Sequence, residues 1–402
     1  MADEDNDFFK LSDFLFSFLP DDKELISNAK RIFDEKRDKY LAEKKCFLCG
    51  REFRRIKSHH IPYSILRNIQ QEEIGKYNFF LNLPFISEKV DGAKKAGTFR
   101  LICSDCDRKY FQNYEKKELY FDEKEGNSSY SLNGLDFITD KFVTEIALKN
   151  YLKSFYERDY EKLAYDALLL AFQNKFGSCL LERYIKNDMS AEEMQTYFCN
   201  MMGYYCPRYA NLKRQYEIYL TDLNDYNRII HELQQTYNNN EFIYKPFFVI
   251  RLNYVVPYAA QSDITLYTDF KGTLINDCYD LKKSASNEEI HVAVFPLKNT
   301  SYVIAGFYYY TKKYNNFILD FEELSIQDKL RAINYIIFKY CDDYYFSKKI
   351  SLSWHERKSI AKVIDSTQFI RKEINYEKII KFHSLNNRYD IPNLLDKKYA
   401  IG

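Results

Sequence analysis

Two pairs of cysteines, each with two residues between its members, most constrain what this chain can fold into. The first pair is Cys46 and Cys49, followed by Gly50, and the second pair is Cys103 and Cys106. Two thiolates at this spacing can bind one tetrahedral ion, and a glycine after the second cysteine lets the backbone turn back. Two such pairs in one chain predict a structural Zn²⁺ site with four cysteine ligands.

The other cysteines do not extend this pattern. The chain has nine cysteines in 402 residues, and the remaining five are scattered through mostly apolar or aromatic stretches, as buried cysteines commonly are. An odd number of cysteines and an acidic N-terminal stretch without signal-peptide character predict a reducing, cytoplasmic location. Four unrelated buried thiols are one alternative to the zinc site. A redox dithiol is another, although neither pair has the usual strand–helix setting.

The segments around the second pair predict how the zinc site is built. A short strand-like run at residues 99–102 precedes Cys103, and a helix is expected at residues 107–119. A turn with one cysteine pair, a strand region, and a second pair at the first turn of a helix form the treble-clef plan. Zinc would hold together a module that is too small to have a hydrophobic core of its own.

Two adjacent histidines, His59 and His60, lie between the cysteine pairs of a chain that has only six histidines. Neighbouring side chains of a strand point to opposite faces, so we do not expect both to serve one centre. A neutral histidine can take a proton from water or bind a metal ion. The residues alone leave open whether His59 or His60 replaces one cysteine as a zinc ligand.

The order of these motifs resembles the HNH endonuclease family of the ββα-metal type. The first cysteine pair is followed by His59-x-x-Pro62, and the second pair precedes a helix. The resemblance implies that His59 is the general base. It also implies that Asp107, directly after the last cysteine, binds a catalytic Mg²⁺ or Mn²⁺ ion.

Two positions depart from the family pattern. The acidic metal ligand before the base falls on Ser58, and the family's asparagine before the second cysteine pair falls on Thr98. His60 would replace the missing acid as a second catalytic-site residue if the strand is bulged or twisted there. The stretch at residues 59–69 is also similar to the opening of an uncharacterised bacterial family that is placed near the HNH group. Both resemblances lie within residues 46–115.

Local charge is consistent with a phosphate-containing partner. Residues 51–110 contain twelve Lys or Arg against seven Asp or Glu, a balance of +5, whereas the whole chain has a net charge of +1. Phosphate contacts from such a segment tolerate different sequences and weaken with salt. An ordinary solvated face is the alternative. The cations expected to contact nucleic acid are Arg54, Arg55, Lys57, Arg108 and Lys109.

Beyond this region, the pattern predicts an α+β protein with four consecutive segments. Residues 1–45 have helical spacing, residues 46–141 hold the zinc module and a connector, and residues 142–240 are helical almost throughout. The pattern of residues 241–402 predicts an α+β domain with antiparallel strands. A sensing or regulatory role is one hypothesis for this domain. No apolar run reaches about 18 residues, so we expect no membrane span.

The expected elements of the last segment can be given in more detail. Strands are predicted at residues 242–256, 264–267, 273–275, 291–295 and 302–310. The second and third of these flank Asp269–Gly272 as a hairpin. A helix is predicted to begin after Ser325, which with Asp328 resembles a capping box.

These patterns lead to two hypotheses about function. The first, which rests on the resemblance, is a metal-dependent endonuclease, a hydrolase that acts on DNA or RNA. The resemblance also implies a role in bacterial antiviral defence. Whether a regulatory ligand or oligomerisation is involved stays open. The second is a non-catalytic treble-clef zinc protein that binds nucleic acid or a protein partner. An accessible His59 near Asp107 favours the enzyme, whereas a buried His59 with both ring nitrogens bonded favours the binding protein.

Overall fold

The chain folds into helices and antiparallel sheets, which confirms the predicted α+β class. The described residues form two compact units, one within residues 1–46, 50–55 and 154–228 and the other within residues 47–49, 56–153 and 229–402. Each unit therefore draws on separate segments of the chain, whereas the sequence suggested four consecutive ones. The residues that this computed structural model describes are 22–43, 45–52, 56–69, 97–116, 130–131, 135–177, 191–200, 203, 205–277, 287–341, 343–347, 349–369 and 376–401.

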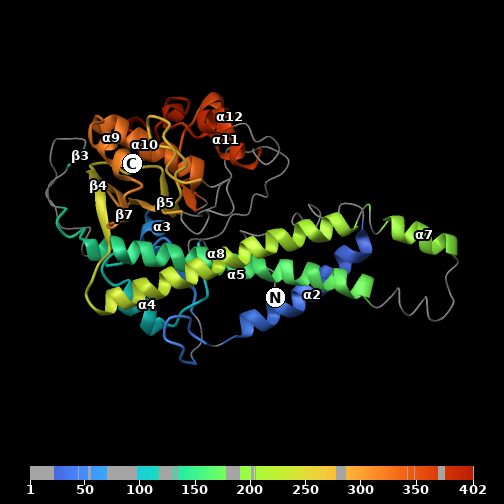
Figure 1. Cartoon of the computed structure of the whole chain (residues 1–402). Helices are drawn as coiled ribbons and strands as arrows, with labels where there is room; N and C mark the ends of the chain where they lie inside the picture. Colours follow the sequence, from blue (N-terminus) through green and yellow to red (C-terminus); the bar gives the residue numbers. More distant parts are fainter. Residues whose placement is uncertain are drawn as a thin grey trace. The chain divides into compact units, whose positions relative to one another are not determined.

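The first unit is helical in its described part (Figure 1). Its helix α2 (Lys23–Ala42) begins after Asp22, whose carboxylate accepts a hydrogen bond from the backbone N–H of Leu25 at 2.9 Å. The apolar face of α2 packs with residues of α5 (Asp140–Gly177) and α8 (Cys206–Asn238) in one core. A further helix, α7 (Ala191–Asn200), lies between α5 and α8 in the sequence.

The second unit contains a six-stranded antiparallel sheet with the strand order β3-β4-β7-β6-β5-β8 (Figure 1). The predictions for β4, β6 and β7 are confirmed. The strand predicted at residues 264–267 is wrong, because β5 ends where it was expected to begin. The expected hairpin around residues 269–272 keeps a single bridge, between Thr268 and Leu274. The strands are β3 (Tyr130–Ser131), β4 (Tyr244–Leu252), β5 (Tyr258–Ile264), β6 (Ile290–Pro296), β7 (Ser301–Tyr308) and β8 (Tyr344–Phe346).

One face of this sheet is covered by apolar helix surface. Alternate residues of β6, Val292 and Val294, share a core with Leu330 and Ile333 of α10. The predicted start of α10 is confirmed, because the Ser325 hydroxyl accepts a hydrogen bond from the backbone N–H of Asp328 at 3.2 Å. The C-terminal helical segments are α9 (Asn315–Glu322), α10 (Ile326–Tyr340), α11 (Trp354–Phe369), α12 (Tyr376–His383), and the 3₁₀ turns η5 (Leu385–Tyr389) and η6 (Lys397–Tyr399).

The first part of α5 packs against the opposite face of the sheet. Gly306 of β7 permits this close approach, because a Cβ atom there would lie 2.2 Å from Cγ1 of Val143. Residues 142–153 of α5 are all buried, although several of them are polar or charged. This half of α5 therefore brings polar side chains into the interior of the second unit.

The cysteine region, defined here as the described residues between 46 and 116, consists of short elements. Ser58 pairs with Phe99, and His59 pairs with Thr98, in a two-stranded antiparallel sheet. The helix predicted at residues 107–119 begins earlier, at Ser104, and ends at Tyr110. The elements are β1 (Ser58–His59), α3 (Tyr63–Ile69), β2 (Thr98–Phe99) and α4 (Ser104–Tyr110).

Candidate zinc centre and adjoining buried networks

The first cysteine pair lies in a tight turn. The backbone N–H of Gly50 donates to the carbonyl oxygen of Cys46 at 2.9 Å, and the N–H of Cys46 donates to the carbonyl of Arg51 at 3.0 Å. Gly50 has a φ of +67°, in the left-handed region that favours glycine. The glycine after the second cysteine therefore has the turning role that its position suggested.

The second cysteine pair lies at the start of α4. Cys103 immediately precedes the helix in an extended conformation, and its carbonyl accepts a hydrogen bond from the N–H of Asp107 at 3.0 Å. The preceding residues are tied back to the first turn, because the N–H of Phe47 donates to the carbonyl of Leu101 at 3.0 Å. These backbone contacts help to bring the two pairs together.

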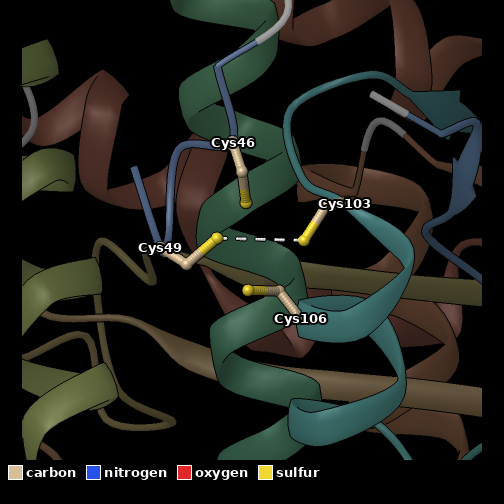
Figure 2. Close-up of side chains that lie close together, drawn as sticks. All are labelled: Cys46, Cys49, Cys103 and Cys106. Atoms are coloured by element: carbon tan, nitrogen blue, oxygen red, sulfur yellow. Dashed lines mark hydrogen bonds between the residues drawn. The ribbon is translucent and has the colours of Figure 1, made fainter. Parts of the chain in front are cut away.

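The four cysteine sulfur atoms lie within 4.8 Å of one another (Figure 2). The sulfur atoms of Cys49 and Cys103 are 3.9 Å apart. Four thiolates around one tetrahedral Zn²⁺, each about 2.3 Å from the ion, lie about 3.8 Å from one another. The donor set and its spacing therefore fit a closed structural zinc site, which has no open position for catalysis.

His59 lies on β1, one residue from a side chain that contacts Asp107. It is half-buried, and its ring tilts against Tyr63 with the ring centroids 5.4 Å apart. The hydroxyl of the neighbouring Ser58 donates to Oδ1 of Asp107 at 2.5 Å. Because successive strand residues point to opposite faces, Ser58 is the residue of β1 that faces Asp107.

Asp107 is paired with a lysine that the sequence analysis did not single out. Nζ of Lys149, on α5, donates to Oδ1 of Asp107 at 2.8 Å, to Oγ of Ser58 at 2.7 Å and to Oε1 of Glu115 at 3.0 Å. The Lys149 side chain is 0% exposed, whereas Asp107 is 21% and Glu115 is 31% exposed. The carboxylate of Asp107, which was expected to bind a catalytic ion, thus contacts an ammonium group.

This arrangement does not fit the Mg²⁺ or Mn²⁺ ion that the family resemblance implies. Mg²⁺ needs oxygen ligands at about 2.0–2.1 Å in octahedral geometry and usually keeps several waters. The Lys149 ammonium already takes Oδ1 of Asp107, and a second cation only a few ångströms away would be repelled.

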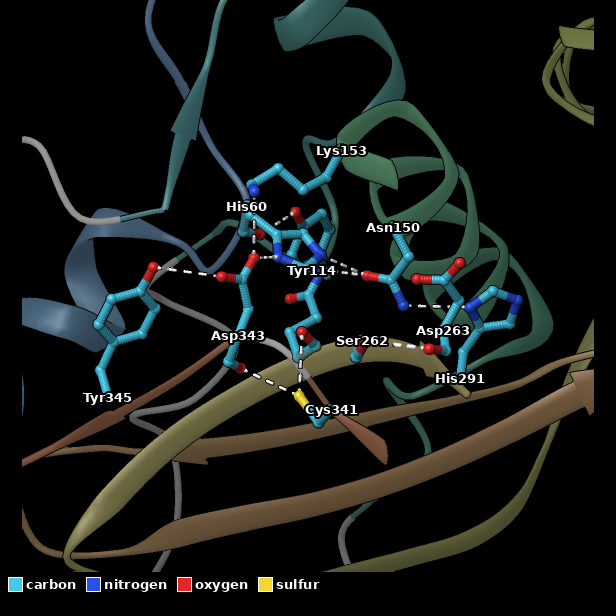
Figure 3. Close-up of polar contacts among 11 residues, drawn as sticks. His60, Tyr114, Asn150, Lys153, Ser262, Asp263, His291, Cys341, Asp343 and Tyr345 are labelled. Carbon is cyan, nitrogen blue, oxygen red and sulfur yellow. Dashed lines mark hydrogen bonds and ion pairs between the residues drawn. The ribbon is translucent and has the colours of Figure 1, made fainter. Parts of the chain in front are cut away.

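His60 lies in a separate buried network (Figure 3). Its ring is 3% exposed, with Nδ1 2.8 Å from Oδ2 of Asp343 and Nε2 2.8 Å from Oδ1 of Asn150. Asp343 also forms an ion pair with Lys153 of α5 at 3.5 Å. His60, which directly follows β1, thus contacts both α5 and the segment before β8.

Asn150 makes two further hydrogen bonds in this network. Oδ1 of Asn150 accepts from the side-chain amide of Gln261 at 2.8 Å, and Nδ2 of Asn150 donates to Nδ1 of His291 at 3.0 Å. Both ring nitrogens of His60 thus face side-chain oxygen atoms, Oδ2 of Asp343 and Oδ1 of Asn150. Burial, together with the charge of His60, lowers the pKa of His291 to about 3, so His291 is neutral and accepts.

The predicted phosphate-binding cations have different positions. Arg54 and Arg55 lie outside the described residues, whereas Lys57, Arg108 and Lys109 are exposed. Arg108 forms an ion pair with Asp105 at 3.7 Å, and Lys109 donates to the side-chain oxygen of Asn238 at 2.7 Å.

Sequence analysis missed the buried charges of α5 although one signal was present. Lys149 and Lys153 continue the spacing of Phe142 and Ile146, so both lysines fall on an apolar helix stripe. A lysine at such a position is rarely buried without an acidic partner. That signal predicts buried acids, but it does not say that Asp107 and Asp343 are among them.

None of the helices in the described part of the chain combines the length and apolar character needed to cross a bilayer. Comparison with known proteins gave no match: no family model, no curated protein and no solved structure is detectably similar to this chain.

Proposed function

We propose that this chain is a treble-clef zinc protein that binds nucleic acid through its cysteine region without cleaving it. Cys46, Cys49, Cys103 and Cys106 are the proposed zinc ligands. A zinc ion closed by four thiolates supplies structure rather than a reactive water. Its role is to fix β1 and β2 against α4, elements that are too short to be stable alone.

The observation that carries this proposal is the opposite placement of anions and cations. In residues 56–69 and 97–116, Asp107 and Glu115 are turned toward Lys149, and the remaining acid, Asp105, is exposed and pairs with Arg108. The pairing turns both carboxylates toward Lys149, whose single positive charge offsets one of their two negative charges. The exposed cations of the same residues are Lys57, Arg67, Arg108, Lys109 and Lys116.

Such a distribution of charge supports contacts with the phosphate backbone. Phosphate contacts give affinity without base readout. They weaken as the salt concentration rises, because the release of counterions from the nucleic acid then gains less free energy. Arg108 and Lys109 are adjacent on α4, which directly follows the second cysteine pair. A phosphate-binding surface would therefore depend on zinc for its shape.

Fluorescence anisotropy with labelled DNA and RNA oligonucleotides tests this function. We expect the zinc-loaded protein to bind at low salt, with log K falling linearly with log salt concentration. Each single replacement of Lys57, Arg108 or Lys109 by Ala should make this negative slope shallower by about 0.7–0.9. The matched controls Lys362→Ala and Lys378→Ala, which change exposed cations outside the cysteine region, should leave the slope unchanged. Absent binding, or equal effects of both sets, would overturn the assignment.

The endonuclease activity that the HNH resemblance implies is the second candidate. It is favoured by one contact, between Ser58 and Asp107, which brings the carboxylate of α4 to the strand that carries His59. Activity of that type requires Asp107 to be released from Lys149. The two candidates therefore make opposite predictions about cleavage.

A further inference from the structure

Three oxygen atoms from three separate segments converge on the Lys149 ammonium. They belong to the hydroxyl of Ser58 on β1, the carboxylate of Asp107 on α4 and the carboxylate of Glu115 beyond α4. The ring of Phe111 lies on another side, with its centroid 3.9 Å from Nζ. The ammonium is therefore enclosed by oxygen acceptors and an aromatic face, and the side chain is not exposed to solvent.

The two carboxylates at this site need a positive charge beside them. Asp107 and Glu115 both contact one ammonium, so two carboxylates share a single positive charge. Burial raises the pKa of Glu115, the Lys149 ammonium opposes this shift, and the nearby Asp107 adds to it. Without Lys149, two partly buried carboxylates would lie close together with no positive charge between them.

We propose that Lys149 is the built-in cation of this site, and that its ammonium excludes a divalent ion for which Ser58, Asp107 and Glu115 would otherwise provide oxygen ligands. Carboxylate and hydroxyl oxygens are hard ligands of the kind that Mg²⁺ and Mn²⁺ prefer. A divalent ion is excluded because the Lys149 ammonium occupies the position between these oxygen atoms and repels a second cation. The chemistry of the oxygen ligands themselves does not prevent binding.

The surroundings explain why a lysine suits this position. Nζ lies 5.8 Å from the ring centroid of Phe99 as well as near Phe111, and the whole side chain is buried. The apolar stem of a lysine can pass through such surroundings, whereas a hydrated ion needs room for its waters. Truncation of the stem would provide that room.

The neighbouring Lys153 offers a matched control. It is one helical turn further along α5, is also buried, and pairs with Asp343 at 3.5 Å. Its acidic partner differs from those of Lys149, because Asp343 is also bound by the His60 ring. One carboxylate that is already paired with a histidine is not a site for a divalent ion.

Thermal unfolding of the zinc-loaded full chain with and without 1 mM Mn²⁺, about one thousand times a micromolar dissociation constant, tests the proposal. Lys149→Ala and Lys153→Ala should both lower Tm. Added Mn²⁺ should raise the Tm of Lys149→Ala by about 5 °C or more and leave wild type and Lys153→Ala unchanged. Combining Lys149→Ala with Asp107→Asn should abolish the Mn²⁺ effect.

Binding of one additional Mn²⁺ by Lys149→Ala, counted by electron paramagnetic resonance, should accompany the shift in Tm. If Lys149→Ala is unfolded without metal, Mn²⁺ should restore its circular dichroism spectrum. A wild type that binds Mn²⁺ through Asp107, or a Lys149→Ala variant that Mn²⁺ neither binds nor stabilises, would overturn the proposal. These readouts do not involve oligonucleotides, so they are independent of the proposed nucleic-acid binding.

Discussion

At the residue scale, the adjacent histidines His59 and His60 have different surroundings. His59 is half-buried beside Tyr63, whereas both ring nitrogens of His60 are bonded inside the second unit. The sequence indicated that the two would not serve one centre, because neighbours on a strand face opposite ways. It could not indicate the partners of His60, since Asp343 is 283 residues away along the chain.

We predict that His60→Ala lowers the free energy of unfolding by about 3–5 kcal/mol, because Asp343 and Asn150 each lose a buried hydrogen bond and the ring leaves a cavity. His59→Ala, the matched neighbour, should cost about 1 kcal/mol or less. Urea denaturation followed by circular dichroism measures both. Equal losses for the two variants would contradict the assigned role of His60.

A second prediction concerns pH. Burial, with the nearby Asp263 carboxylate, raises the pKa of Glu289 to about 8, above its usual value of 4.5. The unfolded chain loses this proton first, so Glu289 makes the fold progressively less stable as pH rises from about 4.5 to about 8. Glu289→Gln should match wild type near pH 4 and be more stable at pH 8.

The same urea denaturation, repeated across this pH range, gives the comparison. Glutamine keeps an oxygen that can accept the hydrogen bond from the Tyr151 hydroxyl, which is 3.0 Å from Oε2 of Glu289. A variant that is equally or less stable than wild type at pH 8 would show that Glu289 is ionised in the folded chain.

At the element scale, local signals predicted the elements whose ends are set by nearby residues. Ser325 caps α10 as expected, and Asp22 caps α2 in the same way, because in each case the capping partner lies three residues away. The strand β5 was misplaced, since Gln261, Ser262 and Asp263 give it little strand character. Gln261 points into the buried network of Asn150, and this tertiary contact cannot be derived from local sequence.

Zinc removal should act on the short elements of the cysteine region first. The helix α4 has seven residues and β1 and β2 have two each, too few to be stable without a crosslink. Cys106→Ser should remove bound zinc and increase amide hydrogen exchange in residues 97–116. Cys199→Ser, which changes an exposed cysteine outside the pairs, should retain one zinc per chain. Unchanged exchange in the zinc-free variant would contradict a structural zinc.

At the scale of the whole molecule, composition and periodicity predicted the α+β class, and the cysteine spacing predicted which sulfur atoms would meet. They did not predict the two compact units, because periodicity shows that a helix has an apolar face but not which segment covers it. The pairing of Lys149 with Ser58, 91 residues away, is of this kind. That pairing separates the binding hypothesis from the endonuclease hypothesis.

The most direct test is to incubate the zinc-loaded protein with plasmid DNA and with RNA, in the presence of Mg²⁺, Mn²⁺ or neither. On this account, the cysteine region binds nucleic acid but does not cleave it, because Lys149 holds Asp107. We predict that the nucleic acid stays bound to the protein at low salt and remains intact under all three conditions. Cleavage that requires the divalent ion and disappears in His59→Ala would contradict this and establish the endonuclease.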